Sequence, residues 1–224
     1  MALPKLNTPT YELEVPSTDE KLKYRPFLVK EEKILLMAME SGKNEDIIQA
    51  VKDIVSECTF NKIDLGSMPM FDVEYIFLNI RAKSVGEVSK LKLLCPDDKK
   101  TYVDTEVNLT EVQVQVDEEH TNKIELTDDM GMIMTYPTID SFSESGIQNV
   151  NASNMIDVIS SCILQIYENK GEKVYQAKDQ TKKELIEFVE QLNTQQFKEL
   201  QKFFDTMPKL KHTVKVKNPK TKKS

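Results

Sequence analysis

The sequence predicts an α+β fold, because the spacing of its apolar residues changes twice along the chain. Apolar residues recur with helical spacing from about Lys30 to Gly86, and they alternate with polar residues from about 87 to 140. Helical spacing returns at about 153. We therefore expect N-terminal helices, a central antiparallel β-ribbon, a C-terminal helical hairpin and a terminal β-strand.

These changes divide the chain into five segments. They are an extended N-terminal arm at 1–29, a helical region at 30–86, an antiparallel acidic ribbon at 87–140, a helical region at 141–206, and a basic terminal strand and turn at 207–224. The arm holds four of the nine prolines, which exclude a continuous helix there. Because an extended arm has unpaired backbone groups, we expect it to add to a sheet edge in its own chain or in a neighbour's.

Three helices are expected in the first helical region. The apolar run at 34–39 predicts a short buried helix that ends at Gly42, and a second helix follows Asn44. A third helix from about 70 to 84 carries two apolar stripes and therefore needs two neighbours.

The ribbon begins with strands at 87–94 and 101–107, joined by a tight turn at 95–100. Alternating valines predict a third strand at 112–116. Two further segments, 124–126 and 132–136, are candidates for additional edge strands of the ribbon.

The second helical region is expected to start at Ser153, with an apolar stripe of Ile156, Ile159, Ile163 and Ile166. Thr181 and Glu184 match a capping box at the start of the helical hairpin.

The final segment reads as a strand with one apolar and one cationic face, followed by a turn at Asn218-Pro219. The chain ends at Ser224, before any returning strand. The mate of this strand is expected from the ribbon of the same chain, from a partner protein, or from residues missing beyond Ser224.

Charge is distributed unevenly along the 224 residues, whose formal net charge is −7. Residues 104–157 carry 12 acids and one base, whereas 207–224 carry seven lysines and no acid. The two regions are expected to attract one another, to bind partners of opposite charge, or to form a mixed solvated surface. The sequence has no apolar run of membrane-spanning length and no apolar leader, so we expect an intracellular protein.

Cys95, Pro96 and Asp98 form a degenerate metal knuckle. A zinc knuckle needs two thiolates at Cys-x-x-Cys spacing, but Asp98 stands where the second cysteine belongs. The turn at 218–221 aligns with it without gaps and has no thiol. We therefore expect a metal-free, zinc-ribbon-like structure without cofactor.

Catalysis is not expected. Neither His120 nor His212 lies in a nucleophile or metal motif, and phosphate-binding glycine motifs are absent from the sequence. An alternative from another class is a nucleic-acid-binding ribbon protein, because the lysine-rich end offers phosphate contacts. That end has neither Arg nor an aromatic residue after Phe204 for reading bases.

Three sequence stretches resemble a known family. They are Tyr24-Arg-Pro-Phe-Leu-Val-Lys-Glu-Glu-Lys33 with its apolar continuation to Ser41, Cys58-Thr-Phe with Ile63-Asp-Leu65, and 71–86. They resemble the baseplate hub subunit and hub assembly proteins of T-even-type bacteriophages. Some members keep full Cys-Pro-x-Cys knuckles, which this chain lacks.

The resemblance implies a non-enzymatic late protein of the virion tail baseplate hub, made in the host cytoplasm, with other hub proteins as partners. An assembly chaperone that is absent from the mature virion is the alternative. The interface candidates are Tyr24, Arg25, Phe27, Lys30, Lys211, Lys215 and Lys217, with the exposed side of helix 70–84. The other interpretation of the Tyr24–Lys33 run is that it packs the arm onto its own core.

Overall fold

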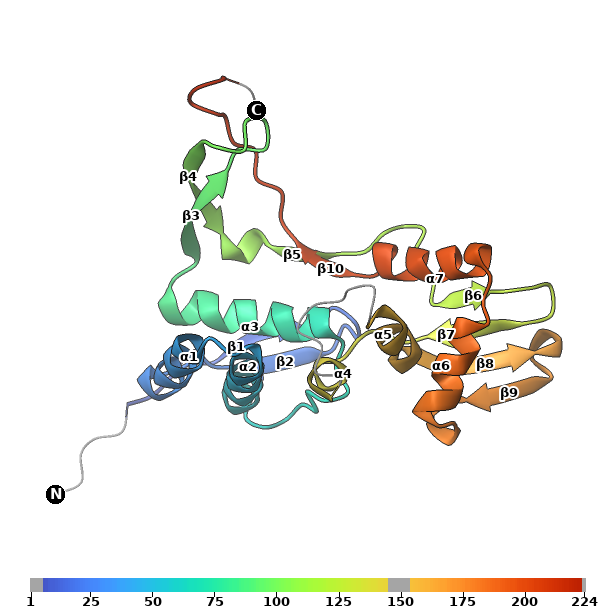
Figure 1. The fold of residues 1–224 in the computed structure, drawn as a ribbon. Helices are drawn as coiled ribbons and strands as arrows, with labels where there is room; N and C mark the ends of the chain where they lie inside the picture. The colour runs from blue at the N-terminus through green and yellow to red at the C-terminus, as the bar shows by residue number, and fades with distance from the viewer. Residues whose placement is uncertain (1–5, 145–153, 223–224) are drawn as a thin grey trace. The chain divides into compact units, whose positions relative to one another are not determined.

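The computed structural model describes residues 6–144 and 154–222. It has the expected α+β composition, with short helices and small antiparallel sheets (Figure 1). The chain forms two compact units, which we describe separately. The first comprises residues 1–63, 71–115 and 210–224, and the second comprises 64–70 and 116–209. Among the described residues, no helix has the length and apolarity to span a bilayer.

The predicted arm contains a β-hairpin in the first unit. Strands β1 (Tyr11–Glu14) and β2 (Lys21–Tyr24) pair with each other in antiparallel register. The turn between them is tied to α3 (Met70–Val85), because the backbone N–H of Ser17 donates to Asp72 Oδ1 at 3.1 Å. The arm thus pairs within its own sequence, since the connection at 15–20 lets its two extended stretches satisfy each other's backbone groups.

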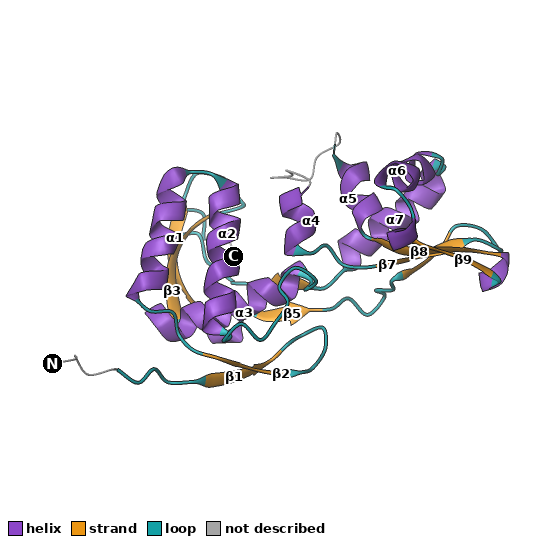
Figure 2. Cartoon of the chain, turned by 90° about the horizontal axis from the view of Figure 1, so that it is seen from below, coloured by secondary structure: helices purple, strands orange, loops and turns teal. Residues whose placement is uncertain are grey.

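The expected helices of the first unit are present. Helices α1 (Val29–Ser41) and α2 (Asn44–Cys58) lie side by side (Figures 1 and 2). The turn between them depends on Gly42, whose φ of 67° is a left-handed conformation that glycine adopts without strain. Ile54, Val55 and Cys58 of α2 are buried.

The ribbon prediction is correct for its first hairpin. Strands β3 (Val88–Leu94) and β4 (Tyr102–Asn108) pair antiparallel through seven residue pairs. After the short 3₁₀ helix η1 (Leu109–Glu111), the third predicted strand is β5 (Gln113–Gln115), which pairs with β10 (Lys209–Lys211) instead of with the hairpin.

The later edges of the predicted ribbon belong to a four-stranded sheet in the second unit. Its order is β6 (Lys123–Glu125), β7 (Gly131–Met134), β8 (Ile163–Glu168) and β9 (Lys173–Gln176), all antiparallel. The 3₁₀ turns η2 (Asn169–Gly171) and η3 (Ala177–Asp179) flank β9.

Helices α5 (Met155–Ser161), α6 (Lys182–Glu190) and α7 (Thr194–Thr206) cover one face of this sheet (Figure 2). Their contact forms the core of the second unit, in which Met132, Leu200 and Phe203 are almost fully buried. A further short helix, α4 (Ile139–Glu144), precedes α5.

The prediction of one helix carrying Ile156, Ile159, Ile163 and Ile166 is wrong. Helix α5 ends at Ser161, and Ile163 and Ile166 lie in β8, where they face the same core as Ile159. Isoleucine suits a strand at least as well as a helix, and pairing with β7 and β9 decides the outcome. The predicted start at Ser153 lies outside the described residues.

The terminal strand is also shorter than predicted. Strand β10 ends at Lys211, and residues 212–217 have no strand assignment although their apolar and polar residues alternate. Alternation alone does not make a strand, because each strand needs a neighbour for its backbone groups.

Candidate assembly interface

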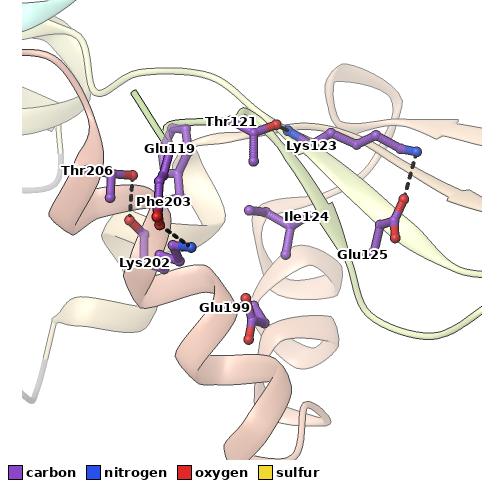
Figure 3. Close-up of a pocket in the computed structure, with 9 residues that line it drawn as sticks. All are labelled: Glu119, Thr121, Lys123, Ile124, Glu125, Glu199, Lys202, Phe203 and Thr206. Carbon is purple, nitrogen blue, oxygen red and sulfur yellow. Dashed lines mark hydrogen bonds and ion pairs between the residues drawn. The ribbon is translucent and has the colours of Figure 1, made fainter. Parts of the chain in front are cut away.

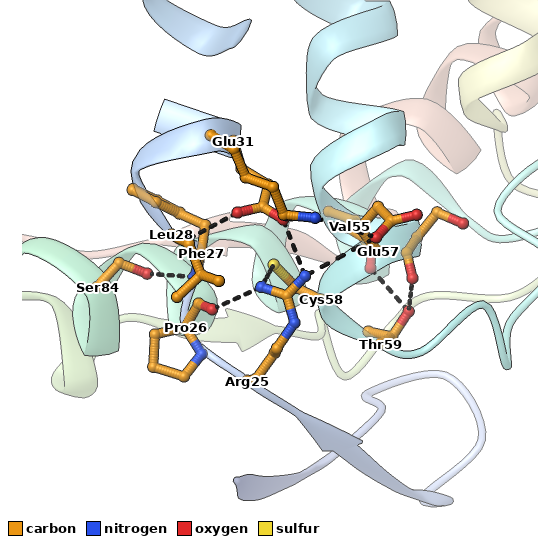
Figure 4. A network of polar contacts seen from close by, with 12 residues as sticks. Arg25, Pro26, Phe27, Leu28, Glu31, Val55, Glu57, Cys58, Thr59 and Ser84 are labelled. Atoms are coloured by element: carbon orange, nitrogen blue, oxygen red, sulfur yellow. Dashed lines mark hydrogen bonds and ion pairs between the residues drawn. The ribbon is translucent and has the colours of Figure 1, made fainter. Parts of the chain in front are cut away.

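Arg25 and Glu31 form an ion pair that links the segment after β2 to the start of α1 (Figure 4). Arg25 Nη2 lies 2.8 Å from Glu31 Oε1, and Nη1 donates to the Pro26 carbonyl at 3.0 Å. Glu31 Oε2 accepts the backbone N–H of Leu28 at 2.7 Å, which caps α1. One buried carboxylate therefore both holds the guanidinium and starts the helix.

The protonation of Glu31 follows from these bonds. Burial by itself would raise the pKa of its carboxyl, but the hydrogen bonds from Arg25, from the Leu28 N–H and from Lys30 outweigh burial and lower the pKa below its ordinary value. The Arg25–Glu31 pair is thus fully charged near neutral pH.

The four interface candidates of the Tyr24–Lys33 run differ in how far their side chains are exposed. Tyr24 and Phe27 are buried in the first unit, and Arg25 is mostly covered. The backbone N–H of Phe27 donates to Ser84 Oγ of α3 at 2.9 Å. Lys30 is exposed and lies 3.1 Å from Glu31 Oε1. Of these four interface candidates, only Lys30 presents its side chain to solvent over most of its area.

Helix α1 also presents apolar side chains to solvent. Val29, Leu36, Met37 and Met39 are each more than half exposed, with Val29 at 80 %. The prediction of a short buried helix from the apolar run at 34–39 is therefore wrong, because α1 is 13 residues long and Ala38 is the one residue of that run that is buried. An apolar run is buried only where neighbouring elements cover it. An apolar surface with flexible methionines is typical of protein interaction sites.

The degenerate knuckle at 95–98 forms a hydrogen-bonded turn without a second thiol. Cys95 is buried, and its N–H donates to the Thr101 carbonyl at 2.8 Å. Asp98 accepts the N–H groups of Lys100 and Thr101, each at 3.0 Å, and the Thr101 hydroxyl at 2.6 Å. These bonds hold the pKa of Asp98 far below its ordinary value, against a smaller effect of desolvation.

The second turn contacts the first one, although 121 residues separate their bonded partners. Asn218 Nδ2 donates to Asp97 Oδ1 at 2.8 Å, and the Thr221 hydroxyl donates to Asp97 Oδ2. Asn218 is buried, and its Oδ1 accepts the N–H of Lys220 at 2.8 Å. Hydrogen bonds thus join the two turns that align in sequence.

No cluster of three or more metal-ligating side chains occurs within residues 6–144 and 154–222. The alignment of the two turns was the signal that could have predicted their contact. It did not single out Asp97, Asn218 or Thr221 as the residues that make it.

In the basic C-terminal segment, the lysines and the valines differ in exposure. Lys211, Lys215 and Lys217 are exposed, as expected for interface candidates, whereas Val214 and Val216 are half-buried. The predicted two-faced character of this segment is therefore present without strand pairing.

The second unit has a polar pocket of about 390 Å³ between α7 and the β6 edge of the sheet (Figure 3). Four of its charged side chains form two ion pairs, with Lys202 Nζ 3.1 Å from Glu119 Oε2 and Lys123 Nζ 3.0 Å from Glu125 Oε1. Phe203 and Ile124 form its apolar wall.

His120 packs against Tyr136 and against Phe203, and Phe203 lines this pocket. Its Nδ1 is 3.0 Å from Thr206 Oγ1, and its Nε2 is 3.0 Å from Tyr136 Oη. The Thr206 hydroxyl donates to the Lys202 carbonyl at 2.8 Å, so His120 Nδ1–H is the donor to Thr206. Burial lowers the pKa of His120, which Asp117 opposes. His120 Nδ1 donates to the Thr206 hydroxyl and therefore does not act as a base that activates this threonine. The absence of a motif around His120 in the sequence gave no signal for these two contacts.

Comparison with known proteins identifies the family. The model of the family described as T4 bacteriophage base plate protein matches residues 8–224. The chain belongs to this baseplate family. No curated protein and no solved structure matches the chain.

Membership in the baseplate family confirms the resemblance found in the sequence at the level of a T4-type baseplate protein. It indicates a structural protein of the virion tail baseplate whose partners are other phage baseplate proteins. Both aligned turns, the Arg25–Glu31 pair and α1 lie within the residues that match.

Proposed function

We propose that this baseplate protein is a non-enzymatic component of the central hub and acts by association with other hub proteins. The family match over residues 8–224 is the observation that carries the proposal. The three stretches that resemble hub proteins support the hub as the location within the baseplate.

Cys58, Cys162 and His120 lack the features of catalytic groups, which supports a non-enzymatic protein. Burial raises the pKa of Cys58 to about 11 and that of Cys162 to about 12, so these thiols are poor nucleophiles at neutral pH. The ring nitrogens of His120 are both bound to hydroxyls of the same unit. Exposed apolar side chains on α1 and the exposed lysines of 209–217 are the features suited to association.

Two roles are compatible with this proposal. The chain is either a subunit that remains in the virion or an assembly factor that leaves before maturation, and in both roles it acts in the host cytoplasm during assembly. We favour the subunit, because a match to a baseplate family describes a component of the structure itself.

Affinity capture of the tagged chain from infected cells tests the proposal. Hub proteins are expected among the captured proteins, and mass spectrometry of purified tails is expected to find the chain at stoichiometric copy number. Presence in assembly complexes but absence from tails would assign the assembly role. Capture without any baseplate protein would contradict the proposal.

A further inference from the structure

Residues 212–217 form an extended segment whose two ends are fixed within the first unit. At one end, β10 pairs with β5, and Gln115 Nε2 donates to the Lys211 carbonyl at 3.3 Å. At the other end, Asn218 is bound to Asp97 in the turn between β3 and β4. The segment runs from β10 toward this turn (Figure 1).

The backbone of this segment has no hydrogen-bonding partner in the described part of the chain. No backbone hydrogen bond and no β-bridge involves residues 212–217 there. The β3–β4 hairpin, whose turn holds Asn218, is a two-stranded sheet that does not include the segment. A row of unpaired N–H and C=O groups is a template on which another strand can form.

The side chains of the segment define which strand would fit. Val214 and Val216 are half-buried and lie on one face, whereas Lys215 and Lys217 alternate with them and are exposed. Residues 207–224 contain no acid that could neutralise these lysines within the segment. A paired strand with apolar residues opposite the valines and Asp or Glu opposite the lysines would form favourable cross-strand pairs on both faces.

We infer that residues 212–217 are an acceptor for a β-strand of another protein, in which acidic and apolar residues alternate. This inference rests on the proposed assembly function and names the chemistry of the partner. Because β10 and the Asn218–Asp97 contact hold both ends, little chain entropy is lost on binding. Main-chain hydrogen bonds supply affinity, and the lysine–carboxylate pairs select the partner.

The probe is the synthetic peptide acetyl-Gly-Glu-Val-Glu-Val-Glu-Val-Gly-amide, added to the full 224-residue chain. We expect it to slow hydrogen exchange of alternate backbone amides within 212–217, measured by NMR. A peptide of the same composition with its glutamates and valines in separate blocks is the control and should give no protection. Equal protection by both peptides, or no protection by either, would overturn the inference.

Charge reversal separates this site from general electrostatic attraction. Lys215→Glu/Lys217→Glu is expected to weaken binding of the alternating peptide at least about fivefold, because two attractive pairs become repulsive. The matched control Lys178→Glu/Lys198→Glu changes the net charge equally at exposed lysines in the second unit and should bind as the unaltered chain does. Equal loss in both variants would contradict a local site.

Sedimentation of the chain alone tests a second copy as the occupant. A monomer is expected, and a dimer that disappears in Lys215→Glu/Lys217→Glu would overturn assignment to a different protein. Capture from infected cells separates this inference from the proposed function. If unaltered chain and Lys215→Glu/Lys217→Glu capture hub proteins equally, the strand-acceptor role fails while the assembly function stands.

Discussion

At the scale of single residues, Glu31 shows how one side chain can fix a local structure. It is buried, pairs with Arg25 at 2.8 Å and accepts the N–H that starts α1. The sequence marked Arg25 as a candidate for contact with a partner, yet its guanidinium is used within the first unit. An interface role for Tyr24, Arg25 and Phe27 stays a prediction, and it would require these covered side chains to become accessible.

Glu31→Gln should destabilise the first unit by about 3 kcal/mol, since it leaves a largely buried guanidinium without its carboxylate. Urea unfolding followed by a probe in that unit measures the change. Glu32→Gln, an exposed acid in the same helical turn, serves as the control and should cost less than about 0.5 kcal/mol. Equal effects of the two substitutions would argue against the pair.

The lowered pKa of Glu31 also predicts how acid affects stability. The folded state holds this carboxylate charged, so its contribution is present above the unfolded pKa of about 4.5 and is lost as the pH falls through the lower folded value. The stability difference between the unaltered chain and Glu31→Gln should therefore shrink below about pH 4.5. A difference that stays constant down to the folded pKa would show that charge is not its source.

At the scale of elements, the two aligned turns and the four-stranded sheet show where local patterns suffice and where they do not. Each turn is stable through its own side-chain-to-backbone bonds, at Asp98 and at Asn218. Their joining through Asp97 fixes the end of the C-terminal segment. Hydrogen bonds from Asn218 and Thr221 to Asp97 cross-link the two turns.

Asn218→Ala should free the C-terminal segment without unfolding the rest of the unit. The amides of Lys220 and Thr221, which donate to Asn218 Oδ1, should exchange at least about tenfold faster, because both lose their acceptor. Site-resolved hydrogen exchange is the measurement, and amides of α2 should keep their rates. Unchanged exchange at 220 and 221 would mean that the contact does not hold the turn.

Gly131→Ala tests the packing of β7 in the second unit. An added methyl group would meet the Tyr167 ring and the Ile124 carbonyl of the neighbouring strands, so it should cost about 1–3 kcal/mol. Thermal unfolding of the second unit measures this cost. Gly171→Ala, in the exposed turn before β9, is the comparison variant. An added methyl group there meets no atom, but the φ of 101° at Gly171 disfavours alanine, so this variant measures backbone strain without a steric clash. Wild-type stability of Gly131→Ala would contradict the close approach.

At the scale of the whole molecule, our proposal makes association depend on residues 207–224, which contribute little to the core of either unit. Among residues 207–217, which precede the turn at Asn218, only Pro208 is buried. Removal of 207–224 takes away β10, the contact with Asp97 and the proposed strand acceptor together.

Deletion of residues 207–224 should abolish incorporation into the hub while helical content stays intact, since every helix of the described residues ends by Thr206. Far-UV circular dichroism checks the helices, and protein composition of purified assembly complexes checks incorporation. The charge variant Lys215→Glu/Lys217→Glu keeps the segment and separates loss of strand acceptance from loss of β10. Normal incorporation of the deleted chain would refute docking through this segment.

The sequence alone determined the features that arise from neighbouring residues. Helical spacing located α2 and α3, the Thr181–Glu184 pair located the start of α6, and the turn after Leu94 joined β3 to β4. Capping and turn formation involve groups a few residues apart, so their signal is present in a short stretch of sequence.

Tertiary structure decided everything that depends on a distant partner. Pairing with β7 and β9 made a strand of Ile163 and Ile166, and Phe27, whose N–H donates to Ser84 of α3, is buried in the first unit. Asp97 and Asn218 met across 121 residues, and 212–217 stayed unpaired despite a strand-like pattern. The physical reason is that burial and backbone pairing are properties of two surfaces, and a local pattern describes only one of them.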